Sequence, residues 1–159
     1  MTATIRRKNP NAVKEVYSRL QRGAGREVAV GFPRGAATAY PETGEAVATV
    51  AAQHVYGVGV PRRDFMAQAQ AGIVEGTRSW MRRAAKAETA QVAEQALEAA
   101  GMAGANAIKV AIVDGDYQAL SEETIRRREE NNRPGAKPLI DTGHMVRSVT
   151  HVVRDGRKD

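Results

Sequence analysis

Apolar positions in the first third of the chain follow first a helical and then a strand-like period. Residues 9–22 place valine, tyrosine and leucine every three or four positions, which predicts an amphipathic helix with Asn9 as its cap. Residues 26–32, "REVAVGF", place an apolar side chain at every second position and predict a strand. The stretch 34–44, with its glycine, threonine and proline residues, predicts a loop.

Helical spacing then dominates the middle of the chain. Valine and alanine recur at helical intervals over residues 46–56, and Gly57 predicts the end of that helix. Residues 57–64 contain Pro61 and predict a corner, at the end of which Asp64 can cap a following helix.

Residues 65–100 consist almost entirely of helix-forming residues. An unbroken helix of this length would span ~54 Å, whereas a compact chain of this size has a radius of gyration of ~15 Å. The pattern therefore predicts either a break at Gly72, at Gly76 or near Arg83, or a helix that reaches another subunit.

The last third combines short helices with a final strand. Gly101 and Gly104 interrupt the pattern before a further predicted helix around residues 108–112. Ser121 is a suitable cap for a short charged helix, and "SVTHVVR" at residues 148–154 alternates in the manner of a strand.

Together these elements predict an α+β fold, in which a small mixed or antiparallel sheet packs against several helices, one of them long. We expect one domain over residues 9–154, flanked by a basic N-terminal arm, 1–8, and a C-terminal tail, 155–159. With 28 alanines and 4% aromatic residues, the core removes little apolar area from water, so contacts with neighbouring subunits would add stability. The core candidates are Phe65, Trp80, Leu120, Ile125, Leu139 and Ile140.

The net charge is +6, and the excess lies in residues 1–35, which hold eight basic and two acidic side chains. Such an arm suits nucleic acid or an acidic protein surface, although charge runs are more often simply solvated. The chain has no cysteine, which excludes disulfides, thiolate metal sites and cysteine nucleophiles. We identify no apolar run of ~18 residues, and we expect a soluble protein made in the cytoplasm.

The triplet Asp141-Thr142-Gly143 is also the triplet that holds the active carboxylate of pepsin-like and retroviral aspartic proteases. Such enzymes need two carboxylates that share a proton, so a single Asp141 would act in a homodimer. That fold would be largely β, whereas about half of this chain is predicted to be helical. The simpler interpretation is a structural turn, in which Asp141 or Thr142 accepts backbone hydrogen bonds and Gly143 supplies an unusual conformation.

Other motifs give weaker signals. His54, His144 and His151 are far apart in the sequence and lack the spacing of a helical zinc site. "PRRDF" sets two arginines beside a phenylalanine, which suits either a phosphate backbone or the acidic groups of a neighbouring protein. We expect no metal, no cofactor and no catalysis.

Three motifs in order resemble a known family. They are a His-x-Tyr-Gly…Pro-x-Arg-x-Phe-like corner over residues 54–65, a Leu-x-x-x-Thr-Ile-x-x-Arg helix over 120–128, and Pro-Leu-Ile-Asp-Thr-Gly at 138–143 followed by a Ser-Val strand. Over roughly residues 46–153 the chain resembles the neck or tail-completion proteins of long-tailed bacteriophages, which include the Mu-type virion morphogenesis proteins. Asp64 departs from the pattern, because relatives often carry an uncharged residue there.

The resemblance implies a structural virion protein that forms a ring, commonly a hexamer, at the head-proximal end of the tail. Genomic DNA would pass through the lumen without sequence specificity, and the neighbours would be tail-terminator, tail-tube or connector proteins. The protein would reside in the virion and, during assembly, in the host cytoplasm. A basic-arm DNA-binding protein remains a third interpretation. The candidate subunit-interface residues are Arg62, Arg63, Phe65, Arg126, Arg127 and Arg128.

Overall fold

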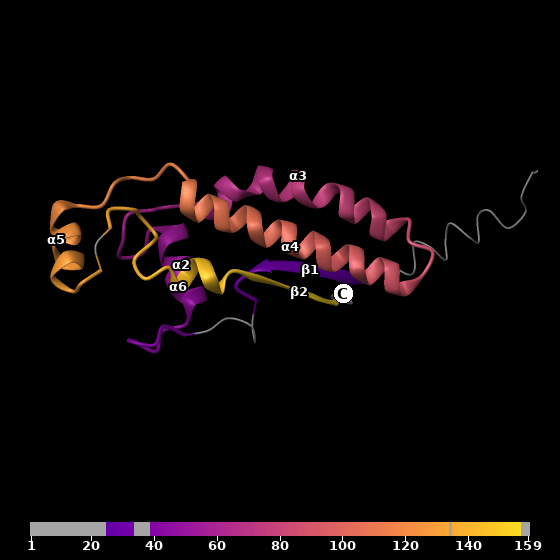
Figure 1. Cartoon of the computed structure of the whole chain (residues 1–159), viewed down its shortest axis with the longest axis horizontal. Coiled ribbons are helices and arrows are strands. Elements are labelled where there is room, and N and C mark those ends of the chain that lie inside the picture. The colour runs from indigo at the N-terminus through magenta and orange to yellow at the C-terminus, as the bar shows by residue number, and fades with distance from the viewer. Residues whose placement is uncertain (1–24, 34–38, 134, 157–159) are drawn as a thin grey trace, which may run out of the picture.

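The computed structural model describes residues 25–33, 39–133 and 135–156. Its largest unit is an antiparallel helical hairpin of α3, Phe65–Ala85, and α4, Ala90–Asp114. The two strands lie along the other side of α4, so this helix is covered by α3 on one side and by the sheet on the other (Figure 1). The predicted helix over 9–22 and the basic arm lie outside the described residues.

The sheet confirms the two predicted strands and is antiparallel. β1, Arg26–Gly31, pairs with β2, Thr150–Asp155, so that Val30 faces His151 and Val28 faces Val153. The fold is therefore α+β, with one two-stranded sheet and five helices among the described residues.

The long helical region is broken after α3. Lys86 ends that helix, where its amide donates to carbonyls of the last turn, and Thr89 begins α4 by accepting a hydrogen bond from the amide of Val92 at 3.2 Å. Of the alternatives that the sequence left open, the break near Arg83 is therefore confirmed, whereas Gly72 and Gly76 lie within α3. Both glycines face alanines of α4, which lets the two helices approach closely.

Gly101 and Gly104 do not interrupt a helix, contrary to the sequence prediction. Both lie inside α4, which runs continuously to Asp114. A Cβ atom at Gly104 would fall 3.0 Å from Val30, and one at Gly101 would overlap the ring of His151. These glycines therefore allow the sheet to lie directly on the helix, and tertiary contact outweighs the low helix propensity of glycine.

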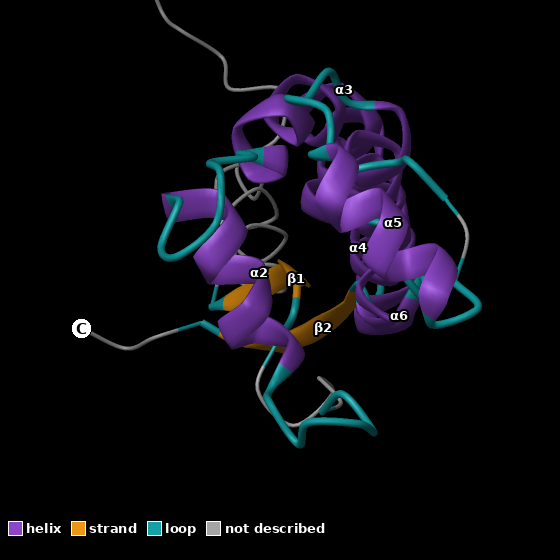
Figure 2. Ribbon diagram, turned by 90° about the vertical axis from the view of Figure 1, so that its left-hand side faces the viewer, coloured by secondary structure: helices purple, strands orange, loops and turns teal. Residues whose placement is uncertain are grey.

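The remaining helices lie at the end of the molecule where α4 finishes (Figures 1 and 2). They are α2, Val47–Tyr56, α5, Glu122–Glu130, and α6, His144–Ser148. Predicted features of their ends are confirmed: Gly57 ends α2 in the left-handed conformation, and Ser121 accepts a hydrogen bond from the amide of Thr124 at the start of α5.

The core joins α2, α3, α4, α6 and the loop before α6. Phe65 is fully buried and its ring meets that of Phe32 edge-on, and Leu139 is 8% exposed. Ile140 is partly buried against the same core. Trp80 is 36% exposed, so its assignment to the core is wrong; it lies beside Arg83. Leu120 and Ile125 are also wrong as core residues, because both are only partly buried.

Among the described residues, α4 is the one helix long and apolar enough to cross a membrane by length and composition alone. This corrects the expectation that no stretch approaches such a length. Half of its most apolar window is buried inside the domain, and the core helix of a globular domain passes the same test.

Candidate functional site

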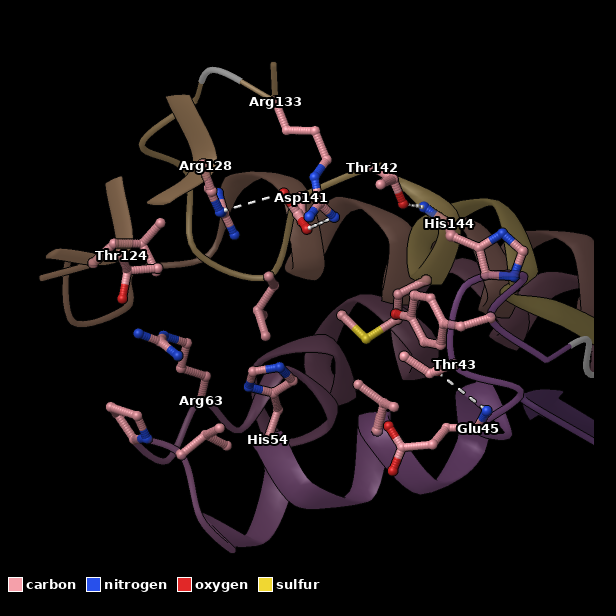
Figure 3. Close-up of a pocket in the computed structure, with 18 of the residues that line it drawn as sticks. Thr43, Glu45, His54, Arg63, Thr124, Arg128, Arg133, Asp141, Thr142 and His144 are labelled. Atoms are coloured by element: carbon pink, nitrogen blue, oxygen red, sulfur yellow. Dashed lines mark hydrogen bonds and ion pairs between the residues drawn. The ribbon is translucent and has the colours of Figure 1, made fainter. Parts of the chain in front are cut away.

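At the end of the molecule that holds α2 and α5 (Figure 2), the structure has a cleft of about 1040 Å³ (Figure 3). Four segments line it: residues 40–45, α2 with the following corner, α5 with the residues on both sides of it, and residues 139–145. Its charged and titratable lining groups are Tyr40, Glu42, Glu45, His54, Arg63, Arg128, Arg133, Asp141 and His144.

The corner after α2 is held by hydrogen bonds to its own backbone. Gly57 adopts φ +74°, and a Cβ atom there would fall 3.1 Å from the Cβ of Arg62. Arg62 Nε donates to the carbonyl of Val55, and its Nη2 lies 2.7 Å from Asp64 Oδ2. The other Asp64 oxygen accepts from the amide of Ala67, which confirms Asp64 as the cap of α3. The amide of Ala67, followed by Arg62, lowers the pKa of Asp64.

Arg63 points from this corner toward the cleft although the residue is only 5% exposed. Its Nε and Nη2 atoms both approach the carbonyl of Gln118 at 3.4 Å, a distance typical of weak hydrogen bonds. No carboxylate of the described residues forms an ion pair with it. Burial, followed by the charge of Arg128, lowers the pKa of Arg63. A guanidinium in this position would gain energy from an added anion.

His54 lies beside Arg63 (Figure 3). Its Nδ1 atom is buried and has no hydrogen-bond partner among the described residues. Burial, followed by the charge of Arg63, lowers the pKa of this imidazole. The neutral ring can still accept or donate one more hydrogen bond, depending on which nitrogen carries the proton.

Arg128 closes the opposite side of the cleft and holds the loop before α6. Its Nη1 atom donates to the carbonyls of Gly135, Lys137 and Ile140 at 2.8 to 3.1 Å. Its side chain is 13% exposed, and its Nε lies 3.5 Å from Asp141 Oδ1. Arg128 is therefore held by three carbonyls and a carboxylate of its own domain, whereas the guanidinium of Arg63 approaches, among the described residues, only the carbonyl of Gln118.

Asp141 lies between two arginines in this loop. Arg133 Nη1 lies 2.9 Å from Oδ2, and Arg128 approaches Oδ1 from the other side (Figure 3). As predicted for a structural turn, Gly143 adopts φ +72° and Thr142 accepts a hydrogen bond from the amide of His144 at 3.3 Å. Of the two predicted acceptors, Asp141 or Thr142, it is therefore Thr142 that accepts the backbone hydrogen bond, and the described contacts of Asp141 are the two ion pairs.

The rim nearest α6 is built from aromatic groups. The rings of Tyr40 and His144 lie 4.9 Å apart, and His144 Nε2 is 3.1 Å from the carbonyl of Ala39. Burial, followed by the negative charge of Asp141, raises the pKa of the Tyr40 hydroxyl. At neutral pH Tyr40 is therefore a neutral donor at the edge of the cleft.

The predicted interface residues occupy different environments. Arg62 is exposed, and Arg126 and Arg127 are exposed with partners on their own helix, Glu130 and Glu123. Arg63 and Arg128 line the cleft from opposite sides. Phe65, which the sequence suggested both as a core residue and as an interface residue, is fully buried, so the core prediction is confirmed and the interface prediction is wrong.

Sequence reasoning did not identify the contributions of His54, Tyr40 and Arg133 to one cleft. The spacing of these three residues along the chain does not indicate that they meet in space, and each residue type is common on protein surfaces. The available signal was the set of three motifs at 54–65, 120–128 and 138–143, each of which contributes to the cleft lining.

Comparison with protein-family models, with curated proteins and with solved structures finds no match to this chain. The resemblance to tail-completion proteins therefore stays a prediction. What the site can do follows from its chemistry: a buried guanidinium, a neutral imidazole and nearby hydroxyl groups can bind a carboxylate or another anion.

Proposed function

We propose that the protein is a structural component of a tailed bacteriophage, which forms a ring at the head-proximal end of the tail and uses the cleft as an assembly surface. The function is tail completion or head–tail joining and requires no chemistry in the protein. DNA passes through the lumen without sequence-specific contacts.

One observation carries the proposal. The three sequence motifs on which the resemblance depends lie at residues 54–65, 120–128 and 138–143, and all three line a single cleft. Arg63 and the carbonyl it approaches are 55 residues apart in the chain. Motifs that meet in space at an incompletely paired cation favour a shared role in binding another protein.

The protease alternative is supported less well by the geometry. Asp141 forms ion pairs with Arg128 and Arg133, so both of its carboxylate oxygens are engaged by cations rather than facing a second carboxylate, as a catalytic dyad requires. Its loop leads into α6 rather than joining two strands of a hairpin. A binding role for Asp141 and its loop is the simpler proposal.

The test is the location of the protein in particles. An antibody against the chain should label purified tailed particles at the head–tail junction, seen by electron microscopy with gold-labelled antibody. Phage made without the gene should accumulate full heads and unjoined tails. Normal particles that lack the protein would overturn the proposed function, whatever its oligomeric state in solution.

A further inference from the structure

We propose that the cleft binds the outer face of α5 from a second copy of this chain, so that a carboxylate of Glu122 or Glu129 pairs with Arg63. The contact would join unlike faces of two copies, and each copy would offer both. The inference rests on the proposed function only in assuming that the protein assembles with itself.

The first step is the state of Arg63. The residue is 95% removed from solvent, lines the cleft and reaches one carbonyl oxygen at 3.4 Å with two of its nitrogens. Its Nη1 atom forms no hydrogen bond with the described residues. A buried guanidinium gains most from a carboxylate that binds it through two parallel hydrogen bonds.

The second step is the size of the cleft. About 1040 Å³ is far more than a single small anion fills. Thr124 and Leu120 line the cleft near α5, and Val60 and Pro61 line it near the corner. A site with apolar walls around a buried cation suits an acidic side chain presented on a folded element.

The third step is α5 itself. This helix has no buried residue and lies at the end of the molecule, apart from the helical hairpin (Figure 1). Thr124 and Arg128 turn toward the cleft of their own copy. A short polar helix without a core contact is marginal in isolation, so a contact on its other side would stabilise it.

The fourth step is the charge on that other side. Glu122 and Glu129 are seven residues apart and share a stripe about 140–160° around the helix from Thr124. Both are exposed, and neither side chain forms an ion pair with the described residues. Arg126 is beside them, with its Nε 3.6 Å from Glu130. The stripe thus offers two exposed carboxylates to Arg63, the one arginine of the cleft lining that forms no ion pair with the described residues.

The kind of assembly follows from the contact, which joins two different faces, α5 of one copy and the cleft of the next. If each copy inserts its α5 into the cleft of the next, the same contact repeats and gives a ring or a filament rather than a two-fold dimer. Carboxylates of the cleft, Glu42, Glu45 and Asp141, lie on its other walls, where they would disfavour wrong orientations of the incoming helix.

The experiment uses two variants of the full chain that each remove one side of the contact. Arg63→Met removes the cation at nearly constant volume, and Glu122→Gln/Glu129→Gln removes both carboxylates. Native mass spectrometry and analytical ultracentrifugation should show oligomers for the wild type and at least tenfold weaker self-association for each variant. Matched controls on the exposed face of α3, Arg78→Met and Glu75→Gln, should assemble like the wild type.

Mixing the two variants gives the decisive measurement. Arg63→Met copies keep the carboxylates and the double variant keeps Arg63, so a mixture should form dimers that cannot extend. Circular dichroism establishes that each variant is folded, and Arg63→Lys provides a conservative cation if Arg63→Met unfolds. A mixture that stays monomeric, a variant that assembles normally, or a wild type that stays monomeric at high micromolar concentration would each overturn the inference. None of these results depends on where the protein lies in a virion.

Discussion

Helices α4 and α5 are held in the molecule by different forces. In α4 ten of 25 residues are buried, against α3 on one side and the sheet on the other. In α5 none of nine residues is buried, and Arg128 ties the adjoining loop through three backbone carbonyls. Apolar burial stabilises the whole fold, whereas such polar bonds stabilise one region, so we expect α5 to open locally while the hairpin stays folded.

The largest expected effect lies in the hairpin. Ile108 is fully buried in α4, and Ile108→Ala should lower the free energy of unfolding by about 2–5 kcal/mol because it leaves a cavity. Ile125→Ala, in the partly buried surface of α5, should cost less than about 1 kcal/mol. Urea unfolding followed by circular dichroism measures both. Equal losses would contradict the contrast between the two helices.

Next comes the polar clamp at the cleft. Arg128→Met removes three hydrogen bonds to carbonyls and should cost at least about 1.5–3 kcal/mol, the range for a single hydrogen bond to a charged group. The effect should be local, with faster amide hydrogen exchange over residues 135–143 and little change in α4. Arg127→Met is the control, since its exposed pair with Glu123 contributes about 0.3–0.5 kcal/mol. Uniformly faster exchange throughout the chain would show that the clamp is part of the global core.

Two glycines of the hairpin, Gly101 and Gly76, test how well the well-packed helices tolerate an added side chain. Gly101→Ala places a new Cβ atom only 3.0 Å from the Cβ of His151. We expect it to lower the free energy of unfolding by about 1–2 kcal/mol, because overpacking outweighs the gain in helix propensity. Gly76→Ala meets Ala103 Cβ at 3.7 Å, an ordinary contact, and should be neutral or stabilising by up to about 1 kcal/mol. Thermal unfolding compares them, and a destabilised Gly76→Ala would mean that the α3–α4 contact tolerates no extra atom.

The same contrast explains what the sequence could predict. Periodicity and caps identified both strands, α2, the start of α3 at Asp64, and α5, because local spacing and local hydrogen bonds determine them. The continuation of α4 through Gly101 and Gly104 depends on His151 and Val30, which are far away in the chain. No local rule distinguishes a glycine that ends a helix from one that admits a strand.

The cleft was predictable only in part, for a related reason. The motifs marked Arg63, Arg128 and Asp141, since each lies in a distinctive local pattern. The different roles of the two arginines were not predictable. Arg128 donates to backbone carbonyls of its own loop, whereas the guanidinium of Arg63 makes only a long contact with one carbonyl of the described residues. Burial distinguishes these two arginines, and burial arises from the packing of segments that are distant in the sequence.

The smallest expected effect concerns His54 and pH. Burial, and then the charge of Arg63, holds the pKa of His54 below its ordinary value near 6.5 in the folded protein. The unfolded chain therefore binds more protons than the folded one as the pH falls below about 6.5, and stability falls in that direction. Above this pH both states are neutral at His54, so its contribution is constant.

His54→Gln tests the assignment because it removes the titrating group and keeps a polar side chain. One proton limits the slope to about 1.4 kcal/mol per pH unit, so the free energy of unfolding of the wild type should decline between pH 7 and 5 more steeply than that of the variant. Urea titrations of both proteins at several pH values measure the difference. Parallel curves would show that His54 keeps its ordinary pKa and that the cleft is better hydrated than its buried Nδ1 atom indicates. A bound carboxylate at Arg63 would screen the cation and raise the pKa of His54, so the slope should shrink when copies assemble, which links this measurement to the proposed contact.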